Sequence, residues 1–179
     1  MSLTFTVLLG VLCFVVLLLI IAAFVKKEYS VERDIIISKP KGIVFDYLKR
    51  LKNQDNFSKW ALMDPNMKKE YRGIDGTPGF VSAWDSTEKN VGKGEQEIKR
   101  ITEGDRIDYE IRFIKPFTGV ANAYLKTTSL PNNRTMVAWG FDSSMKYPMN
   151  LMLLFMNMEK MVGKDFETGL LNLKTLLEK

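Results

Sequence analysis

The feature that most constrains this chain is an uncharged stretch of 23 residues, Leu3 to Val25, near its N-terminal end. A helix rises about 1.5 Å per residue and a bilayer core is about 30 Å thick, so this stretch is long enough to span a membrane. A secretory signal peptide is the main alternative, but it would have a basic n-region, a shorter apolar region and a small-residue cleavage site. The stretch matches this pattern poorly, and we predict that residues 1–27 are an uncleaved transmembrane anchor.

The charges that flank this stretch predict its orientation. Lys and Arg close to a membrane helix tend to stay in the cytoplasm. The nearest basic residues all follow the stretch: Lys26, Lys27, Arg33, Lys39 and Lys41. The single cysteine, Cys13, lies inside the stretch, so it offers no disulfide from which to infer the compartment. We therefore predict a single-pass membrane protein whose C-terminal part is cytoplasmic.

Residues 28–179 amount to one domain, and all 26 basic and 21 acidic residues of the chain lie after Val25. The net charge of +5 raises the question of nucleic-acid binding. However, the two signs are interleaved, as in GKGEQEIKRITEGDR from Gly92 to Arg106, which is typical of a solvated face. We expect no nucleic-acid partner. Lys26 and Lys27 are instead well placed to contact anionic lipid head groups.

Hydrophobic periodicity predicts a strand, two short helices, six strands and a long helix, in that order. Tyr29, Val31 and Ile35 recur at period two, which predicts the first strand over Glu28–Ile37. A stripe at helical spacing predicts a helix after Pro40, with a second short helix or turn at 53–60. The six further strands are predicted at Met67–Arg72, Gly79–Trp84, Gly92–Ile101, Arg106–Phe113, Ala121–Ser129 and Arg134–Asp142.

From about Met149 the helical period returns, and an apolar stripe from Leu151 to Leu177 predicts one long C-terminal helix. The apolar face of such a helix and that of the sheet must be buried against each other. The predicted fold class is therefore α+β: a helix-grip fold, in which a curved antiparallel sheet wraps around a long C-terminal helix, preceded by a single transmembrane helix.

Three segments carry a resemblance to a known family: ERDIIISKPKGIVFDYLKRLKNQDNFSKW, GKGEQEIKRITEGDRIDYEIRF and MEKMVGKDFETGLLNLKTLLEK. With the order of elements, they make the chain from Tyr29 to Lys179 similar to the START-like (SRPBCC) superfamily, which includes polyketide cyclase/dehydrase-like and birch-allergen-like proteins. Bacterial members with one N-terminal membrane helix are the most similar. The resemblance implies a cavity between helix and sheet that accepts lipids, polyketides, sterol-like molecules or hormones. It implies no shared catalytic motif.

The chain contains no histidine, which excludes several chemistries. Ser-His-Asp and Cys-His systems cannot be built within it, and neither can the usual zinc sites. The segment Gly92–Gly94 lacks the rest of a phosphate-binding loop. We expect no metal and no cofactor. Glu95 and Glu97 share a strand face, but Gln96 and Ile98 alternate with them and point inward, so the two carboxylates are predicted to be solvated.

Large apolar and aromatic side chains lie on the elements that would surround a helix-grip cavity. Trp60 and Phe117 are on loops at its predicted mouth, and a few polar groups would orient a ligand. The candidate ligand-binding residues are Trp60, Phe80, Ser82, Trp84, Gln96, Tyr109, Phe117, Trp139, Met152, Phe155 and Met156. The methionines offer flexible side chains toward the edge of the helix stripe, whereas Met158 is predicted to belong to the core. The alternative for each residue alone is that it fills the core.

Three functions follow from these features. The first is membrane-tethered binding of an apolar small molecule or lipid. The second is a cyclase or dehydratase type of enzyme that uses Tyr109 with a buried carboxylate or lysine as acid and base. The third is a protein-interaction domain with a filled core. A charged side chain that points into the cavity would favour the enzyme, and a cavity too small for a ligand would favour the interaction domain.

Overall fold

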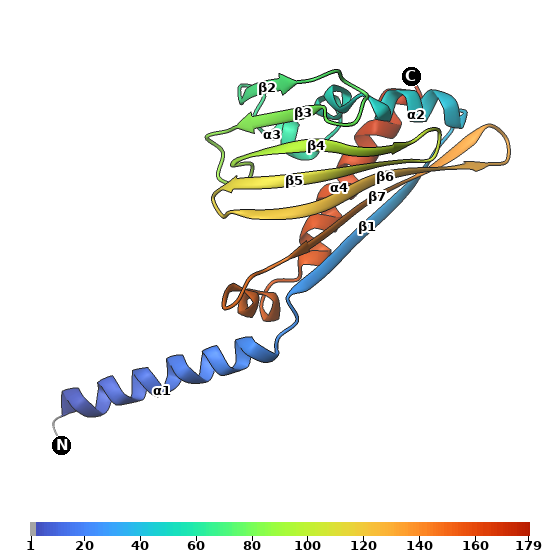
Figure 1. Cartoon of the computed structure of the whole chain (residues 1–179). Coiled ribbons are helices and arrows are strands. Elements are labelled where there is room, and N and C mark those ends of the chain that lie inside the picture. Colours follow the sequence, from blue (N-terminus) through green and yellow to red (C-terminus); the bar gives the residue numbers. More distant parts are fainter. Residues whose placement is uncertain (1–2) are drawn as a thin grey trace.

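A computed structural model describes residues 3–179. Its first helix, α1 (Leu3–Phe24), has a mean hydropathy of 3.3 over its most apolar window, and 6% of that window is buried. Figure 1 shows α1 projecting away from the sheet. Within residues 3–179, α1 is the one helix long and apolar enough to cross a membrane.

Seven strands form a single antiparallel sheet in the order β1-β7-β6-β5-β4-β3-β2. β1 pairs with β7 from Glu28 opposite Ser144 to Ile37 opposite Thr135, and the other strands form a meander. The strands are β1 (Glu28–Ile37), β2 (Lys68–Arg72), β3 (Val81–Asp85), β4 (Lys93–Thr102), β5 (Arg106–Lys115), β6 (Gly119–Leu130) and β7 (Arg134–Ser144). The seven strands predicted from the sequence are thus confirmed.

Five helices follow α1 in the described chain, and the longest of them, α4, packs against the sheet. Figure 1 shows α4 crossing the sheet, with α2 near the C-terminus of the chain. The helices after α1 are α2 (Lys41–Lys49), the 3₁₀-helix η1 (Leu51–Asn56), α3 (Lys59–Met63), the 3₁₀-helix η2 (Met149–Leu154) and α4 (Met158–Leu177). The arrangement confirms the predicted helix-grip fold.

The prediction of one continuous helix from Met149 is wrong at its start. Met149–Leu154 is a separate 3₁₀-helix, and α4 begins only at Met158. The Asn157 side chain caps α4, since its Oδ1 accepts a hydrogen bond from the Lys160 backbone N–H at 2.8 Å. Leu151, Leu154 and Phe155 therefore do not belong to the α4 stripe.

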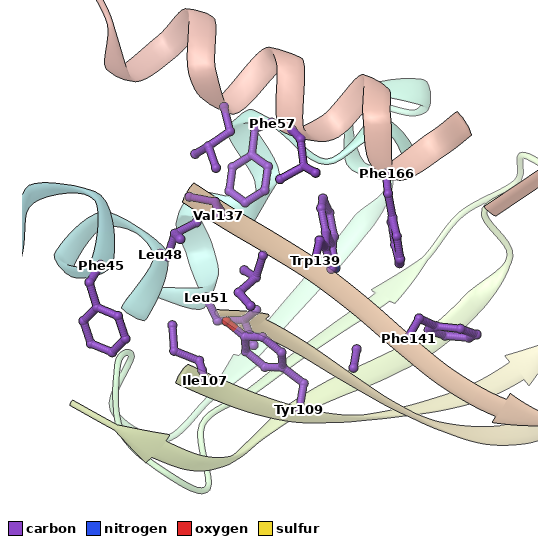
Figure 2. Packing of buried hydrophobic residues seen from close by; sticks show 14 of the residues in the cluster. Phe45, Leu48, Leu51, Phe57, Ile107, Tyr109, Val137, Trp139, Phe141 and Phe166 are labelled. Carbon is purple, nitrogen blue, oxygen red and sulfur yellow. The ribbon is translucent and has the colours of Figure 1, made fainter. Parts of the chain in front are cut away.

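Glycine lets α4 approach the sheet closely. A Cβ at Gly169 would lie 2.8 Å from the Trp139 ring, and that ring stacks on Phe166 with centroids 4.7 Å apart. Figure 2 shows Trp139 and Phe166 side by side in the core. Nearer its N-terminus, α4 is held by Arg33 of β1, whose guanidinium lies 2.7 Å from both Glu159 and Glu167. These contacts set the space between the helix and the sheet.

The outer face of the sheet is charged, as the alternation in β5 predicts. Arg112 lies between the carboxylates of Glu95 and Glu97, at 2.7 and 2.8 Å, and also pairs with Glu110. These hydrogen bonds lower the pKa of both Glu95 and Glu97. The two glutamates are therefore part of an outer-face ion-pair network and are directed away from the inner face, as expected from the sequence.

Candidate ligand-binding cavity

A cavity of about 310 Å³ lies between the inner face of the sheet, η1 with α3, and the first half of α4. This volume is at the lower end of the range of about 300–1,000 Å³ that is usual for small-molecule sites. Its aromatic walls come from six different elements of the fold: Tyr29, Trp60, Trp84, Phe113, Trp139, Phe141 and Phe166. All three tryptophans of the chain are among them.

Strand alternation and register build the floor of the cavity. Ser82 of β3 is opposite Gln96 of β4, and Gln96 is opposite Ile111 of β5, so these three side chains form a row across the inner face. Beside the row, the Trp84 indole lies over Gly94, where a Cβ would come within 2.6 Å of the ring. Its Nε1–H donates to the Val91 carbonyl at 3.2 Å, which fixes the ring in place.

Polar side chains interrupt these apolar walls. Ser82, Gln96, Gln54 and Ser58 line the cavity, and Ser58 is only 8% exposed. Within residues 3–179, none of these four side chains makes a hydrogen bond to another residue. Buried polar groups are normally paired. Their donors and acceptors are therefore available to a bound molecule.

One ion pair also reaches the cavity. Asp55 of η1 and Lys69 of β2 both line it and pair with each other, and the Tyr71 hydroxyl donates to Asp55 Oδ2 at 2.5 Å. Burial, followed by the Asp55 hydrogen bond, raises the pKa of Tyr71. The sequence analysis did not select Asp55 or Lys69. The alternation of Met67, Lys69 and Tyr71 along β2 was a signal for the lysine, but the 3₁₀ turn gave none for the aspartate.

Of the residues selected from the sequence, the structure brings five together around the cavity: Trp60, Ser82, Trp84, Gln96 and Trp139. Phe80 lies outside the lining, in the core, where it stacks on Tyr71 with centroids 6.1 Å apart. Tyr109 is also a core residue. Its buried hydroxyl has no partner within residues 3–179, and Figure 2 shows its oxygen pointing toward Leu51. Burial raises the pKa of Tyr109.

The other four selected residues are displaced because α4 starts later than predicted or because their loop faces solvent. Met152, Phe155 and Met156 lie in and after η2, outside the cavity lining, and the Phe155 side chain is 86% exposed. Phe117, between β5 and β6, is 67% exposed. In their place α4 contributes Met158, which was predicted to be core, together with Val162 and Phe166.

The acidic side chains near the cavity are not grouped as metal ligands would be. Among the described residues, no group of three or more His, Cys, Asp or Glu side chains is placed to hold a metal ion. The cavity therefore offers a ligand an aromatic surface, several free hydrogen-bonding groups and one ion pair.

Comparison with known proteins bears on the fold. No protein-family model and no curated protein matches the chain. Solved structures do match. A Chromobacterium violaceum protein is 12% identical, with a TM-score of 0.58 over 84% of this chain and 97% of its own. Ara h 8.0201 is 13% identical, with a TM-score of 0.56 over 84% of this chain and 97% of its own.

The di-domain ARO/CYC protein BexL from the BE-7585A biosynthetic pathway is 15% identical, with a TM-score of 0.58. The match covers 85% of this chain and 50% of BexL. At these identities the likeness is one of fold, and a fold of this kind hosts many functions. The chain thus shares the helix-grip fold with these solved proteins, and this is the fold that the resemblance in its sequence implies.

Proposed function

We propose that this chain is a membrane-tethered binding protein for an apolar small molecule or lipid. In this proposal residues 1–27 anchor the chain and residues 28–179 form the binding domain. The observation that carries the proposal is the cavity of about 310 Å³, with its aromatic walls and unpaired polar groups. A domain with a filled core, as an interaction module would have, offers no such space.

The distribution of polar groups suggests the kind of ligand. Aromatic rings dominate the walls, so most of the ligand would be apolar. Ser82 and Gln96 are neighbours on the floor and would bind one hydrogen-bonding group of the ligand, while Ser58 faces it from the α3 side. A ligand with one polar end and an apolar body of modest size fits this arrangement best.

The junction between α1 and the rest of the chain supports an anchor that is retained. Asn150 is fully buried, and its Nδ2 donates to the carbonyls of Ala22 at 2.7 Å and Val25 at 3.0 Å. Cleavage after α1 would remove both hydrogen-bond partners of this amide. A retained anchor keeps the cavity close to the bilayer, where an apolar ligand is concentrated. Lys26 and Lys27 favour a cytoplasmic location for the domain.

One observation favours a second candidate, an enzyme of the cyclase or dehydratase type. Asp55 and Lys69 bring opposite charges to the cavity and are the groups that acid–base chemistry there would use. Tyr109 is not in the lining and has no role in this version. An Asp55→Asn chain that still binds the ligand but no longer converts it would favour the enzyme.

The proposal is tested by identifying what the cavity holds. The full chain is purified from its own cells in polymer-bounded discs of native membrane, extracted with organic solvent and analysed by mass spectrometry. Ala123 of β6 lines the cavity, so Ala123→Met would fill part of it. The control is Ala83→Met, which adds the same atoms on β3 but on the outer face of the sheet, between the cavity residues Ser82 and Trp84. We expect one apolar compound to be enriched in the wild type and in Ala83→Met and depleted in Ala123→Met. Identical extracts from all three chains would contradict the proposal.

A further inference from the structure

The segment from Tyr147 to Met158, which we call the η2 segment, is unusual for a connection between a strand and a helix. It contains no charged residue, and it connects β7 to α4. Met149, Leu154 and Phe155 expose large apolar side chains to the surroundings. The cavity does not use them, since within this segment only Met158 belongs to its lining.

The η2 segment is hydrogen-bonded to the C-terminal end of α1 and to Val25, which follows it. The Tyr147 hydroxyl donates to the Leu19 carbonyl at 3.3 Å, and Asn150 binds the carbonyls of Ala22 and Val25. Figure 1 shows the two short turns of this segment beside the C-terminal end of α1. Carbonyls at a helix end have no partner within the helix, so Asn150 takes the place that water would otherwise occupy.

These bonds determine the depth of the segment once α1 spans a bilayer. The charged residues Lys26 and Lys27 mark the end of the apolar span, and Leu19 lies about 9 Å along the helix from Val25, at about 1.5 Å per residue. A segment that contacts the carbonyls of both Leu19 and Val25 therefore lies at the level of the head groups and the first acyl carbons. Tyrosine is enriched at that level, and charged side chains are excluded below it.

We propose that the η2 segment is a second membrane contact, with Phe155, Leu154 and Met149 inserted into the leaflet that the C-terminal turn of α1 crosses. This inference rests on the proposed anchoring by α1. The lipid surface is the occupant that the structure favours, because the exposed apolar side chains lie on a segment hydrogen-bonded to α1, whose own apolar side chains, such as Ile21 and Phe24, are also exposed.

The second contact would fix the cavity relative to the bilayer. A single helix followed by a short connection leaves a domain free to rotate, whereas two adjoining contacts hold it in one orientation. The η2 segment ends at Met158. This residue is the first of α4 and also the first residue of α4 that lines the cavity. The end of the cavity near the start of α4 would therefore be adjacent to the membrane, and an apolar ligand would travel only a short path through water.

Fluorescence quenching in phosphatidylcholine–phosphatidylglycerol vesicles tests this placement with the full chain. A nitrobenzoxadiazole label is attached at position 155 in a chain with Cys13→Ala and Phe155→Cys. The matched control is Cys13→Ala with Ile74→Cys, because Ile74 is another apolar side chain, 76% exposed, between β2 and β3. The unchanged chain labelled at Cys13 reports on α1 itself. Each sample is compared with and without lipids that carry a nitroxide near the head group or deep in the acyl chains.

We expect the label at position 155 to be quenched several-fold more by the shallow nitroxide than the label at position 74, and the Cys13 label to be quenched by the deep one. Quenching at Cys13 with none at position 155 would overturn the second contact and leave the anchor intact. A label at position 155 shielded from both lipid nitroxide and aqueous iodide would show that protein covers the segment, and this too would overturn the proposal. No deep quenching at Cys13 would refute the anchor and the inference together.

Discussion

At the scale of single residues, strand β4 separates two kinds of polar group. Gln96 points inward and has no hydrogen-bond partner within residues 3–179, whereas Glu95 and Glu97 point outward and are bound by Arg112. Because side chains alternate between the two faces of a strand, groups that stabilise the sheet and a group available to a ligand sit at adjacent positions. Arg112 should therefore contribute to stability without being needed for ligand binding.

This role of Arg112 predicts a pH dependence. Its hydrogen bonds lower the pKa of Glu95 and Glu97 below the ordinary value of 4.5 in the folded chain. The resulting stabilisation is fully present above about pH 4.5 and is lost as the pH falls through the folded pKa values. An Arg112→Gln chain should thus be less stable than the wild type near neutral pH, and the difference should shrink on acidification.

Thermal unfolding of the full chain, followed by tryptophan fluorescence at a series of pH values, measures this difference. Arg134→Gln is the matched control, since the Arg134 side chain donates to the Pro131 carbonyl and makes no ion pair with a carboxylate among residues 3–179, so it should show no such trend. A gap between wild type and Arg112→Gln that stays constant from about pH 7 to about pH 3 would show that the two glutamates are not responsible.

At the scale of elements, the packing of α4 against β7 depends on one small residue. Gly169 lies under the Trp139 ring, which is stacked on Phe166 and in edge contact with Phe57 at 5.7 Å between centroids. The ring therefore has little freedom to move away. Any side chain at position 169 must displace either the tryptophan or the helix, and both form walls of the cavity.

Gly169→Ala should therefore destabilise the fold even though alanine favours a helix by about 1 kcal/mol over glycine. Overpacking of this kind costs about 1–3 kcal/mol, so we expect a net loss and a shifted tryptophan emission. Gly42→Ala in α2 is the control, because a Cβ there meets no atom within 4 Å and should leave stability equal or higher. Chemical unfolding of both variants measures the two effects, and a gain of stability for Gly169→Ala would refute the close packing.

The elements also show what the sequence could and could not predict. The strands were predictable because a half-buried strand alternates visibly, as β5 does with Ile107 and Asp108. The start of α4 was not, because apolar residues continue at helical spacing from Met149 onward. Asn157 was a usable local signal for a helix cap. The separate turn at η2 depends on the bond between Asn150 and α1, a tertiary contact that no local pattern displays.

The same limit applies to the candidate site. Alternation correctly placed Ser82, Trp84 and Gln96 on the inner face, and it placed Tyr109 there too. Alternation gives the face of a strand but no position along it. Ile111 and Phe113 of β5 line the cavity, whereas Tyr109, nearer the start of the strand, belongs to the buried core that also contains Leu48 of α2 and Leu51 of η1. The extent of the cavity is set by helices whose placement the sequence pattern does not specify.

At the scale of the whole molecule, the proposed function combines an anchor, a second membrane contact and a cavity in one chain. The contacts of Asn150 and Tyr147 connect the first two, and α4 connects the second to the third. The cavity is the part on which the proposal depends most, because a tether without a binding site would have no ligand to hold. Its occupancy by an apolar molecule is therefore the central claim.

The most direct measurement is quenching of intrinsic fluorescence by bromonaphthalene, an apolar molecule with a heavy atom. All three tryptophans of the chain line the cavity, so a molecule that enters the cavity lies close to every tryptophan that contributes to the emission. In lipid nanodiscs the full chain should be quenched with saturation, several-fold more weakly in Ala123→Met and unchanged in Ala83→Met. Quenching that rises linearly without saturation, and equally in all three chains, would contradict a ligand-binding cavity.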